Sequence, residues 1–135
     1  MIPKPDHDDS FDVTIEAGEK NAVNISAKII DYCRARNIDE RTAYILGLAA
    51  EEISVNISRY GYDKVKKSYI DINLSHDGEQ WILRIRDDGI PFDPTQYQSE
   101  EENKFLLGGI NLIKGLAKKL NYVRVLNMNN TIIEI

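Results

Sequence analysis

The chain has 135 residues, of which 42% are hydrophobic and 29% charged, and 22 acidic against 17 basic residues give a net charge of −5. This length is typical of one domain with one hydrophobic core, and the composition is that of a globular protein rather than a disordered one. The acidic balance disfavours a general nucleic-acid binder, and no apolar run approaches the roughly 20 residues of a membrane span.

The cysteine and histidine content limits the chemistry further. Cys33 is the single cysteine, which excludes an internal disulfide and a zinc site built from cysteines, and His7 and His76 lie far apart. The start, MIPKPDHDDS, lacks the apolar segment of a secretory signal and carries two prolines. We therefore expect a cytoplasmic protein with a flexible N-terminus at residues 1–10 and a single domain at residues 11–135.

The first half of the chain alternates between strand and helix patterns. Apolar and polar residues alternate over 11–16, which predicts a strand, and helical spacing predicts a helix over 21–37. Asp39 is suited to cap a second helix that runs to about Tyr60, and Gly61 is suited to end it. The apolar stripe of the first helix is Ala22, Ile25, Ile29 and Cys33, and that of the second is Leu46, Ala50, Ile53 and Ile57. Cys33 is interpreted as a small core residue.

Two alternating segments follow, at 70–74 and 81–85, and the turn residues at 76–78 predict a hairpin between them. An acidic, irregular segment at 92–106 is long for a loop in a compact domain, and such loops often form lids.

The C-terminal part is predicted to hold one helix and a hairpin. Gly108-Gly109 opens a helix over about 110–120, and strands at 122–126 and 131–135 close the chain around 128–130. Grouped strands with interspersed helices predict an α+β fold, a two-layer α/β sandwich whose mixed, mostly antiparallel sheet has its helices on one face.

Two polar residues of the second predicted helix are candidates for chemistry. Positions four apart on a helix lie about 40° apart in projection, so Glu52 and Asn56 share a face that borders the apolar stripe. A carboxylate there can act as a general base, and an amide oxygen is suited to Mg²⁺. The alternative is that both are solvated residues beside the core, and the helix taken alone favours that alternative.

Asp87 continues the phase of the buried positions in the strand that begins at Trp81. Its carboxylate should therefore point inward where the strand ends, and a buried carboxylate needs a partner, such as the amino group of adenine. Gly89 permits the close approach of a ligand or of another backbone. The alternative is an aspartate that caps a turn before glycine, and the strand alone does not decide between the two.

Gly108-Gly109 supplies a third candidate. Free backbone N–H groups and the helix dipole favour an anion at a helix start, and glycine allows it to come close. The alternative is an ordinary loop end.

The order of these features resembles the GHKL ATPases, which share the Bergerat nucleotide-binding fold of histidine kinases, gyrase and the Hsp90 chaperones. Within that family, the closest resemblance is to the anti-sigma factor serine kinases. EISVNISRYGY at 52–62 resembles the N box, and RDDGIPFDP at 86–94 resembles the first glycine box. LGGINLI at 107–113 resembles the second glycine box, and Asn130-Thr131 stands where the family has a Gly-Thr or Asn-Thr pair near the phosphates. The resemblance covers nearly the whole chain, from about residue 11 to residue 135.

This resemblance implies that ATP or ADP binds together with Mg²⁺. Asn56 would help to hold Mg²⁺ against the phosphates, Asp87 would bind the adenine amino group, and Gly89 would make room for the base. Glu52 would be the general base toward the serine hydroxyl of a partner protein. The other implied nucleotide-binding residues are Pro91, Lys104, Gly108, Gly109 and Thr131.

The implied function is that of an ATP-binding anti-sigma regulatory factor with serine-protein kinase activity. It would bind a sigma factor, phosphorylate a small anti-sigma-factor antagonist, and form a homodimer near the first strand and helix, without direct contact with nucleic acid or membrane. The chain lacks a histidine-containing dimerisation helix, which disfavours a sensor histidine kinase.

Two further functions compete with this one. Leu107 occupies the first glycine position of the second box and leaves less room for phosphates. This departure favours a non-catalytic ATP-binding module that regulates a partner protein, whereas Glu52 favours the kinase. A fold that has lost its nucleotide ranks last, because it would have little reason to keep Asn56, Asp87 and Gly109 together.

Overall fold

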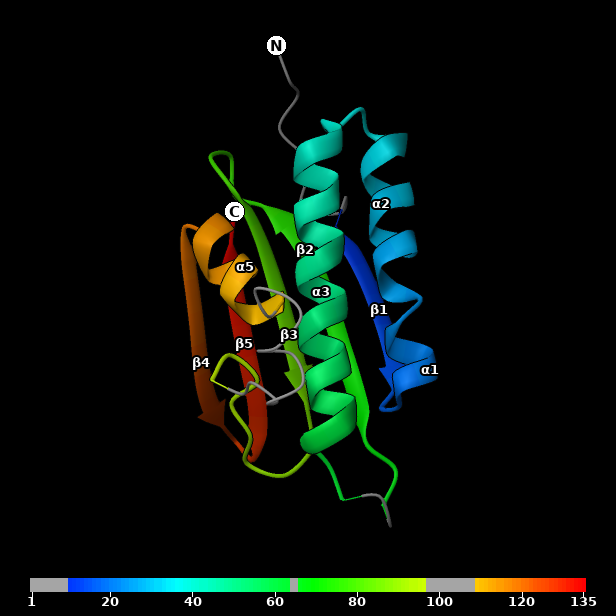
Figure 1. Cartoon of the computed structure of the whole chain (residues 1–135), viewed down its shortest axis with the longest axis vertical. Helices are drawn as coiled ribbons and strands as arrows, with labels where there is room; N and C mark the ends of the chain where they lie inside the picture. Colours follow the sequence, from blue (N-terminus) through cyan, green and yellow to red (C-terminus); the bar gives the residue numbers. More distant parts are fainter. Residues whose placement is uncertain (1–9, 64–65, 97–108) are drawn as a thin grey trace.

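The computed structural model describes residues 10–63, 66–96 and 109–135. A layer of helices packs on one face of a five-stranded sheet (Figure 1). In spatial order the strands are β1 (Phe11–Glu16), β2 (Tyr69–His76), β3 (Trp81–Asp87), β5 (Met128–Glu134) and β4 (Lys119–Val125). All four described strand pairs are antiparallel. The predicted α+β fold is confirmed, and the sheet shows only the antiparallel pairing that was expected to dominate it.

The helices are α1 (Glu19–Ala22), α2 (Ile25–Ala35), α3 (Glu40–Tyr60) and α5 (Gly109–Leu116), and α3 runs along the strands over the middle of the sheet (Figure 1). The start of α3 was predicted correctly, since the Asp39 side chain accepts a hydrogen bond from the backbone N–H of Thr42 at 3.0 Å. Its end was also predicted, because α3 stops at Tyr60 and the N–H of Gly61 bonds to the carbonyl of Ile57 at 2.8 Å. In the part of the chain that is described, no helix is long and apolar enough to cross a membrane.

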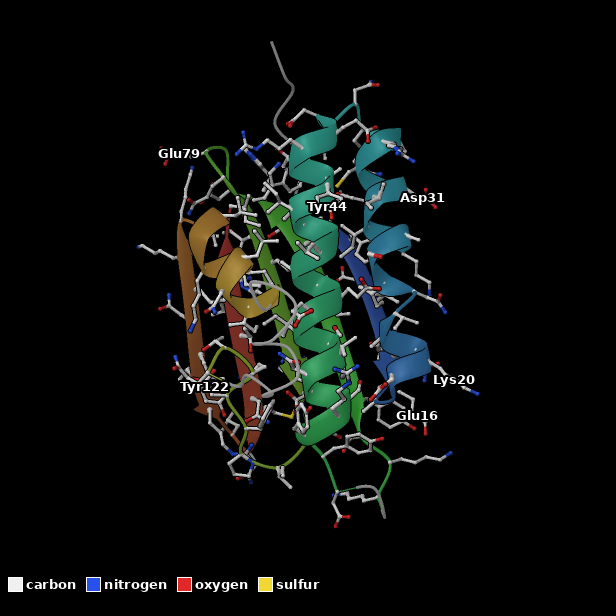
Figure 2. The ribbon with its side chains drawn as sticks, viewed as in Figure 1. Glu16, Lys20, Asp31, Tyr44, Glu79 and Tyr122 are labelled. Carbon is white, nitrogen blue, oxygen red and sulfur yellow. The ribbon has the colours of Figure 1, made fainter. Side chains whose placement is uncertain are left out.

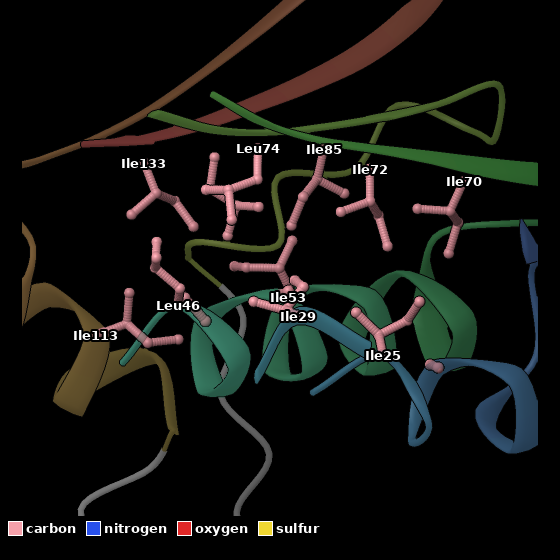
Figure 3. Close-up of a cluster of buried hydrophobic side chains, with 14 of the residues drawn as sticks. Ile25, Ile29, Leu46, Ile53, Ile70, Ile72, Leu74, Ile85, Ile113 and Ile133 are labelled. Carbon is pink, nitrogen blue, oxygen red and sulfur yellow. The ribbon is translucent and has the colours of Figure 1, made fainter. Parts of the chain in front are cut away.

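The hydrophobic core lies between the two layers (Figure 3). Both predicted helix stripes are buried in it, and Cys33 is fully buried as a core residue. Figure 3 shows the facing side chains of the sheet and the helices: Ile70, Ile72, Leu74, Ile85 and Ile133 from strands, and Ile25, Ile29, Leu46, Ile53 and Ile113 from helices. Lys20 on α1 and Asp31 on α2 lie at the edge of the helix layer, on the side away from α3 (Figure 2).

The predicted helix over 21–37 is wrong at its start, because the chain breaks between α1 and α2 at Val23 and Asn24. The Asn24 side chain donates to the backbone carbonyl of Lys20 at 3.3 Å. Such local side-chain bonds compete with the backbone bonds that continue a helix. The apolar stripe therefore runs without interruption although the chain forms two helices.

The predicted boundaries of the C-terminal elements are also wrong. Helix α5 ends at Leu116 rather than near residue 120, since the N–H of Lys118 already bonds to the carbonyl of Glu134 at 2.7 Å and starts the sheet pairing.

The hairpin turn falls at Leu126 and Asn127, not at 128–130. Both residues have positive φ, 54° and 62°, as a two-residue hairpin turn with a right-handed twist requires. Asn tolerates this conformation, but the apolar Leu126 continues the strand pattern and hides the turn from the sequence. The segment at 128–130 therefore belongs to β5.

Candidate functional site

Asp87 ends β3 with its side chain on the helix-covered face of the sheet, where it is 1% exposed, as the strand phase predicted. Its Oδ1 atom accepts hydrogen bonds from the backbone N–H of Gly89 and from Nδ2 of Asn129, both at 3.0 Å. Its Oδ2 atom is buried and has no hydrogen-bond partner among the described residues. A buried carboxylate oxygen without a hydrogen-bond donor destabilises the fold, so this atom marks a position where a ligand N–H group fits.

The surroundings of Asp87 both raise and lower the pKa of its carboxyl group. Burial raises the pKa of the Asp87 carboxyl above its ordinary value, because it disfavours the charged form. The hydrogen bonds from Asn129 and Gly89 lower this pKa, the negative charge of Asp88 raises it, and the positive charge of Arg124 lowers it.

Asn56 lies in α3 and is fully buried, and neither Oδ1 nor Nδ2 of its amide has a hydrogen-bond partner within the described residues. Glu52, one turn earlier on the same helix, is half-buried. This places Asn56 inside and Glu52 at the boundary, which agrees with the predicted shared face. The Ser54 hydroxyl of the same helix is a third buried polar group that lacks a partner in the described part, and the sequence did not single it out.

The Asn56 amide fits a magnesium ion that is shared with a ligand. Over the described residues, no group of three or more His, Cys, Asp or Glu side chains is arranged to hold a metal ion by itself. Mg²⁺ usually takes only one or two protein ligands and completes its shell with phosphate oxygens and water. The orphaned amide of Asn56 therefore suits Mg²⁺ that arrives with phosphates.

Thr131 lies in β5 with 1% exposure, on the same face of the sheet as Asp87. Its register partner is Ile85, and the next inward pair along the two strands is Asp87 with Asn129. The structure thus places Asn56, Asp87 and Thr131 in the layer between the helices and the sheet.

Gly89 joins the two segments that carry these residues. A Cβ atom on Gly89 would lie 2.1 Å from the Gly61 carbonyl oxygen and 2.9 Å from Oδ1 of Asp87. The next residue, Ile90, donates its N–H to that same Gly61 carbonyl at 3.0 Å. Glycine at 89 is therefore required by contact with the end of α3, and its predicted role toward a base stays a prediction. Pro91 is exposed.

The second glycine box is described only in part. Gly109 begins α5, as the helix-start interpretation predicted. Lys104, Leu107 and Gly108 lie outside the described residues, and the predicted lid at 92–106 is described only as far as residue 96.

The sequence missed the residue that connects most of the site, Asn129. Its Nδ2 donates to Oδ1 of Asp87 and to the backbone carbonyl of Ile90, at 3.0 and 2.7 Å. Its Oδ1 accepts from the Tyr122 hydroxyl and, at 2.9 Å, from Nη1 of Arg124. Figure 2 shows Tyr122 on β4, at the side of the sheet where the loop after β3 passes. Asn129 was assigned to a turn, whereas its alternation with Thr131 and Ile133 would have placed it on the buried face.

A hollow lies away from these residues, on the uncovered face of the sheet. It has a volume of about 480 Å³ and is lined by Asp12, Val13, Thr14, Asp71, Ile72, Asn73, Arg84, Arg86 and Asn130. It contains none of the predicted site residues, and several of its polar side chains pair with one another, as Arg86 does with Asp71 at 3.3 Å and Asn73 with Asp12 at 2.6 Å.

Comparison with known proteins identifies the family. The model of the histidine kinase-like ATPase domain matches residues 15–135, which include Asn56, Asp87 and Asn129. The chain belongs to the histidine kinase-like ATPase domain family. No curated protein matches the chain significantly.

Among solved structures, this ATPase domain is similar to the histidine kinase domain of a blue-light activated histidine kinase from Erythrobacter litoralis, with a TM-score of 0.54 and 23% sequence identity. The match covers 82% of this chain and 60% of that chain, so this chain spans less than two thirds of that structure. At this identity the likeness concerns the fold.

Proposed function

We propose that this histidine kinase-like ATPase domain binds ATP or ADP with Mg²⁺ in the layer between α3 and the sheet. One observation carries the proposal: Oδ2 of Asp87 and both polar atoms of the Asn56 amide are buried without partners among the described residues. The Asp87 oxygen on β3 can accept a hydrogen bond from an adenine amino group. The Asn56 amide oxygen on α3 can bind Mg²⁺ that is held by the phosphates.

We propose further that the domain is an anti-sigma regulatory factor with serine-protein kinase activity. The support is the N box, in which Glu52 stands one helical turn before Asn56 and is half-buried at the edge of the layer. Glu52 would take the proton of a serine hydroxyl on a small anti-sigma-factor antagonist, while bound ATP supplies the phosphoryl group. In such transfers the protein mainly positions groups and neutralises charge.

The same proposal includes a sigma factor as a second partner and a homodimer formed near β1 and the helices that follow it. Both rest on the resemblance to the anti-sigma factor kinases.

A second function is favoured by one feature of the sequence. Leu107 stands at the position of the first glycine of the second glycine box, and a side chain larger than glycine would leave less room for phosphates. A non-catalytic ATP-binding module that regulates a partner protein would tolerate this replacement.

The nucleotide proposal is tested by calorimetric titration of the purified chain with ATP and ADP, with and without Mg²⁺. We expect binding that Mg²⁺ strengthens, and no binding at millimolar nucleotide would overturn both functions.

An Asn56→Leu variant sharpens this test. Leucine has nearly the shape of asparagine and lacks the unpartnered amide, so the ligand-free protein should melt at the same or a higher temperature. Its affinity for ATP should no longer depend on Mg²⁺. A wild-type Mg²⁺ response in this variant would remove Asn56 from the metal site.

A further inference from the structure

We propose that Asn129 is a positioning residue that holds the Asp87 carboxylate with one oxygen open to a donor group of the ligand. This inference rests on the proposed nucleotide site, because it assigns the residue that orients the base-recognising carboxylate of that site.

The orientation of the Asn129 amide is fixed by its neighbours. Its Oδ1 faces Nη1 of Arg124 at 2.9 Å and the backbone N–H of Phe92 at 3.4 Å, and both of these groups can only donate. Its Nδ2 faces a carbonyl and a carboxylate, the oxygens of Ile90 and Asp87, which accept. A flipped amide would turn an acceptor toward acceptors and a donor toward donors, so only one orientation satisfies the site.

The fixed Nδ2 donor of Asn129 determines which oxygen of the Asp87 carboxylate is free to accept a hydrogen bond from a ligand. Asn129 and the N–H of Gly89 both bond to Oδ1, at 3.0 Å each, and together they hold the plane of the carboxylate. Oδ2 is left buried and without a partner among the described residues. Asn129 therefore separates the two oxygens into one that anchors the group and one that receives the ligand.

Asn129 also bears on the protonation of the carboxylate. Its hydrogen bond favours the charged form and lowers the pKa of Asp87, against the larger effect of burial. The charges acting on this group are those of Asp88 on the following loop and Arg124 on β4. The Tyr122 phenol of β4 reaches it through Asn129. On the neighbouring β2 the register partner of Asp87 is Ile70, which does not titrate.

The test compares two substitutions of Asn129 with a matched control on the other face of the sheet. Asn129→Ala removes the donor, whereas Asn129→Asp keeps an acceptor for Arg124 and Tyr122 and turns a second oxygen toward Asp87. The control is Asn73, whose Nδ2 donates to a carboxylate in the same way, to Oδ1 of Asp12 at 2.6 Å, away from the site. ADP affinity is measured against pH for all variants, and the Asp87 carboxyl pKa is measured by carbon NMR in the ligand-free proteins.

Wild-type affinity should fall as the pH drops through the Asp87 pKa, because a protonated carboxyl no longer accepts the ligand donor in the same way. Asn129→Ala should weaken ADP binding roughly tenfold to a hundredfold at neutral pH, which is the effect of one hydrogen bond to a charged group. Its affinity should begin to fall at higher pH, in step with a raised Asp87 pKa.

Asn129→Asp should give a profile of opposite sign. The introduced carboxyl can donate to Oδ1 of Asp87 only when it is protonated, so affinity should fall as the pH rises and the pair of carboxyls loses its shared proton. Asn73→Asp should leave the wild-type profile unchanged. A merely structural role for Asn129 would lower the melting temperature without reversing the sign of the pH profile.

An unchanged Asp87 pKa in Asn129→Ala, or a wild-type pH profile in Asn129→Asp, would overturn the inference. Failure of the wild-type protein to bind ADP would instead overturn the proposed function. The NMR titration of the ligand-free protein still decides the Asn129 inference in that case, and Asn129→Asp decides it if Asn129→Ala does not fold.

Discussion

Asp87 lowers the stability of the ligand-free fold at neutral pH. Burial raises its folded-state pKa, so between the unfolded and the folded pKa values the native chain binds more protons than the unfolded chain. Stability therefore falls as the pH rises through that window, and the loss persists above it. Groups that reduce stability in this way are typical of functional sites.

Asp87→Asn should separate stability from binding. The amide keeps an oxygen for the Gly89 and Asn129 donors and removes the buried charge, so the variant should melt no lower than the wild type at neutral pH. It should lose about 1.5–3 kcal/mol of adenine nucleotide affinity, since it loses a charge-assisted hydrogen bond. Thermal melts across the acidic range and calorimetric titration check both parts. A large drop in melting temperature with unchanged affinity would make Asp87 a structural residue.

Cys33 presents the opposite case of a titratable group that serves only the core. It is fully buried in α2, and burial raises the pKa of its thiol to about 11. The thiolate is the reactive form, so a thiol reagent at about pH 8 should leave the native protein unmodified and react quickly after denaturation. Mass spectrometry over time reads the result. Rapid stoichiometric labelling of the native protein would show that α2 opens far more readily than its packing indicates.

The site depends on the contact between the end of α3 and the loop after β3. Gly89→Ala would drive a Cβ atom to 2.1 Å from the Gly61 carbonyl, so we expect a loss of about 1–3 kcal/mol of stability and weaker nucleotide binding. Gly115 in α5 is the matched control, because a Cβ there meets nothing within 4 Å. Gly115→Ala should stabilise the protein by about 0.5–1 kcal/mol. Chemical denaturation measures both, and equal effects of the two substitutions would refute the contact.

The same elements show what the sequence could and could not reveal. Periodicity and capping located α3 and the buried phase of β3, because the apolar stripe and the alternating pattern are local properties. Asn129 was missed because its contact with Asp87 depends on the register between β3 and β5. The turn was placed two residues too late in the sequence, which obscured this register. Likewise, a local bond from Asn24 broke a helix whose stripe is continuous. Strand pairing is a tertiary effect, and the Asn24 bond is a single side-chain contact, so the apolar periodicity of the sequence records neither.

The proposed site lies between the two layers of the molecule, which are otherwise joined mainly by apolar contacts. Asn56 comes from the helix layer, whereas Asp87 and Thr131 come from the sheet. A nucleotide that contacts both would tie the layers together, in the kinase and in the binding module alike. Nucleotide binding therefore cannot distinguish the kinase from the binding module. The distinction needs a residue that is required for phosphoryl transfer but not for binding.

Glu52 is that residue, and its neighbour Glu51 provides the control. Glu51 turns toward α2, where its Oε1 accepts a hydrogen bond from the Ser26 hydroxyl at 3.5 Å. Glu52→Gln should bind ATP as the wild type does and lose about 10²–10⁴-fold in transfer rate, the usual contribution of a general base, while Glu51→Gln keeps both properties. The assay follows labelled phosphate from ATP to purified proteins of the anti-sigma-factor antagonist class. Equal transfer by Glu52→Gln and the wild type would place the base elsewhere, and a wild-type protein that binds ATP without transfer to any of them would favour the regulatory module.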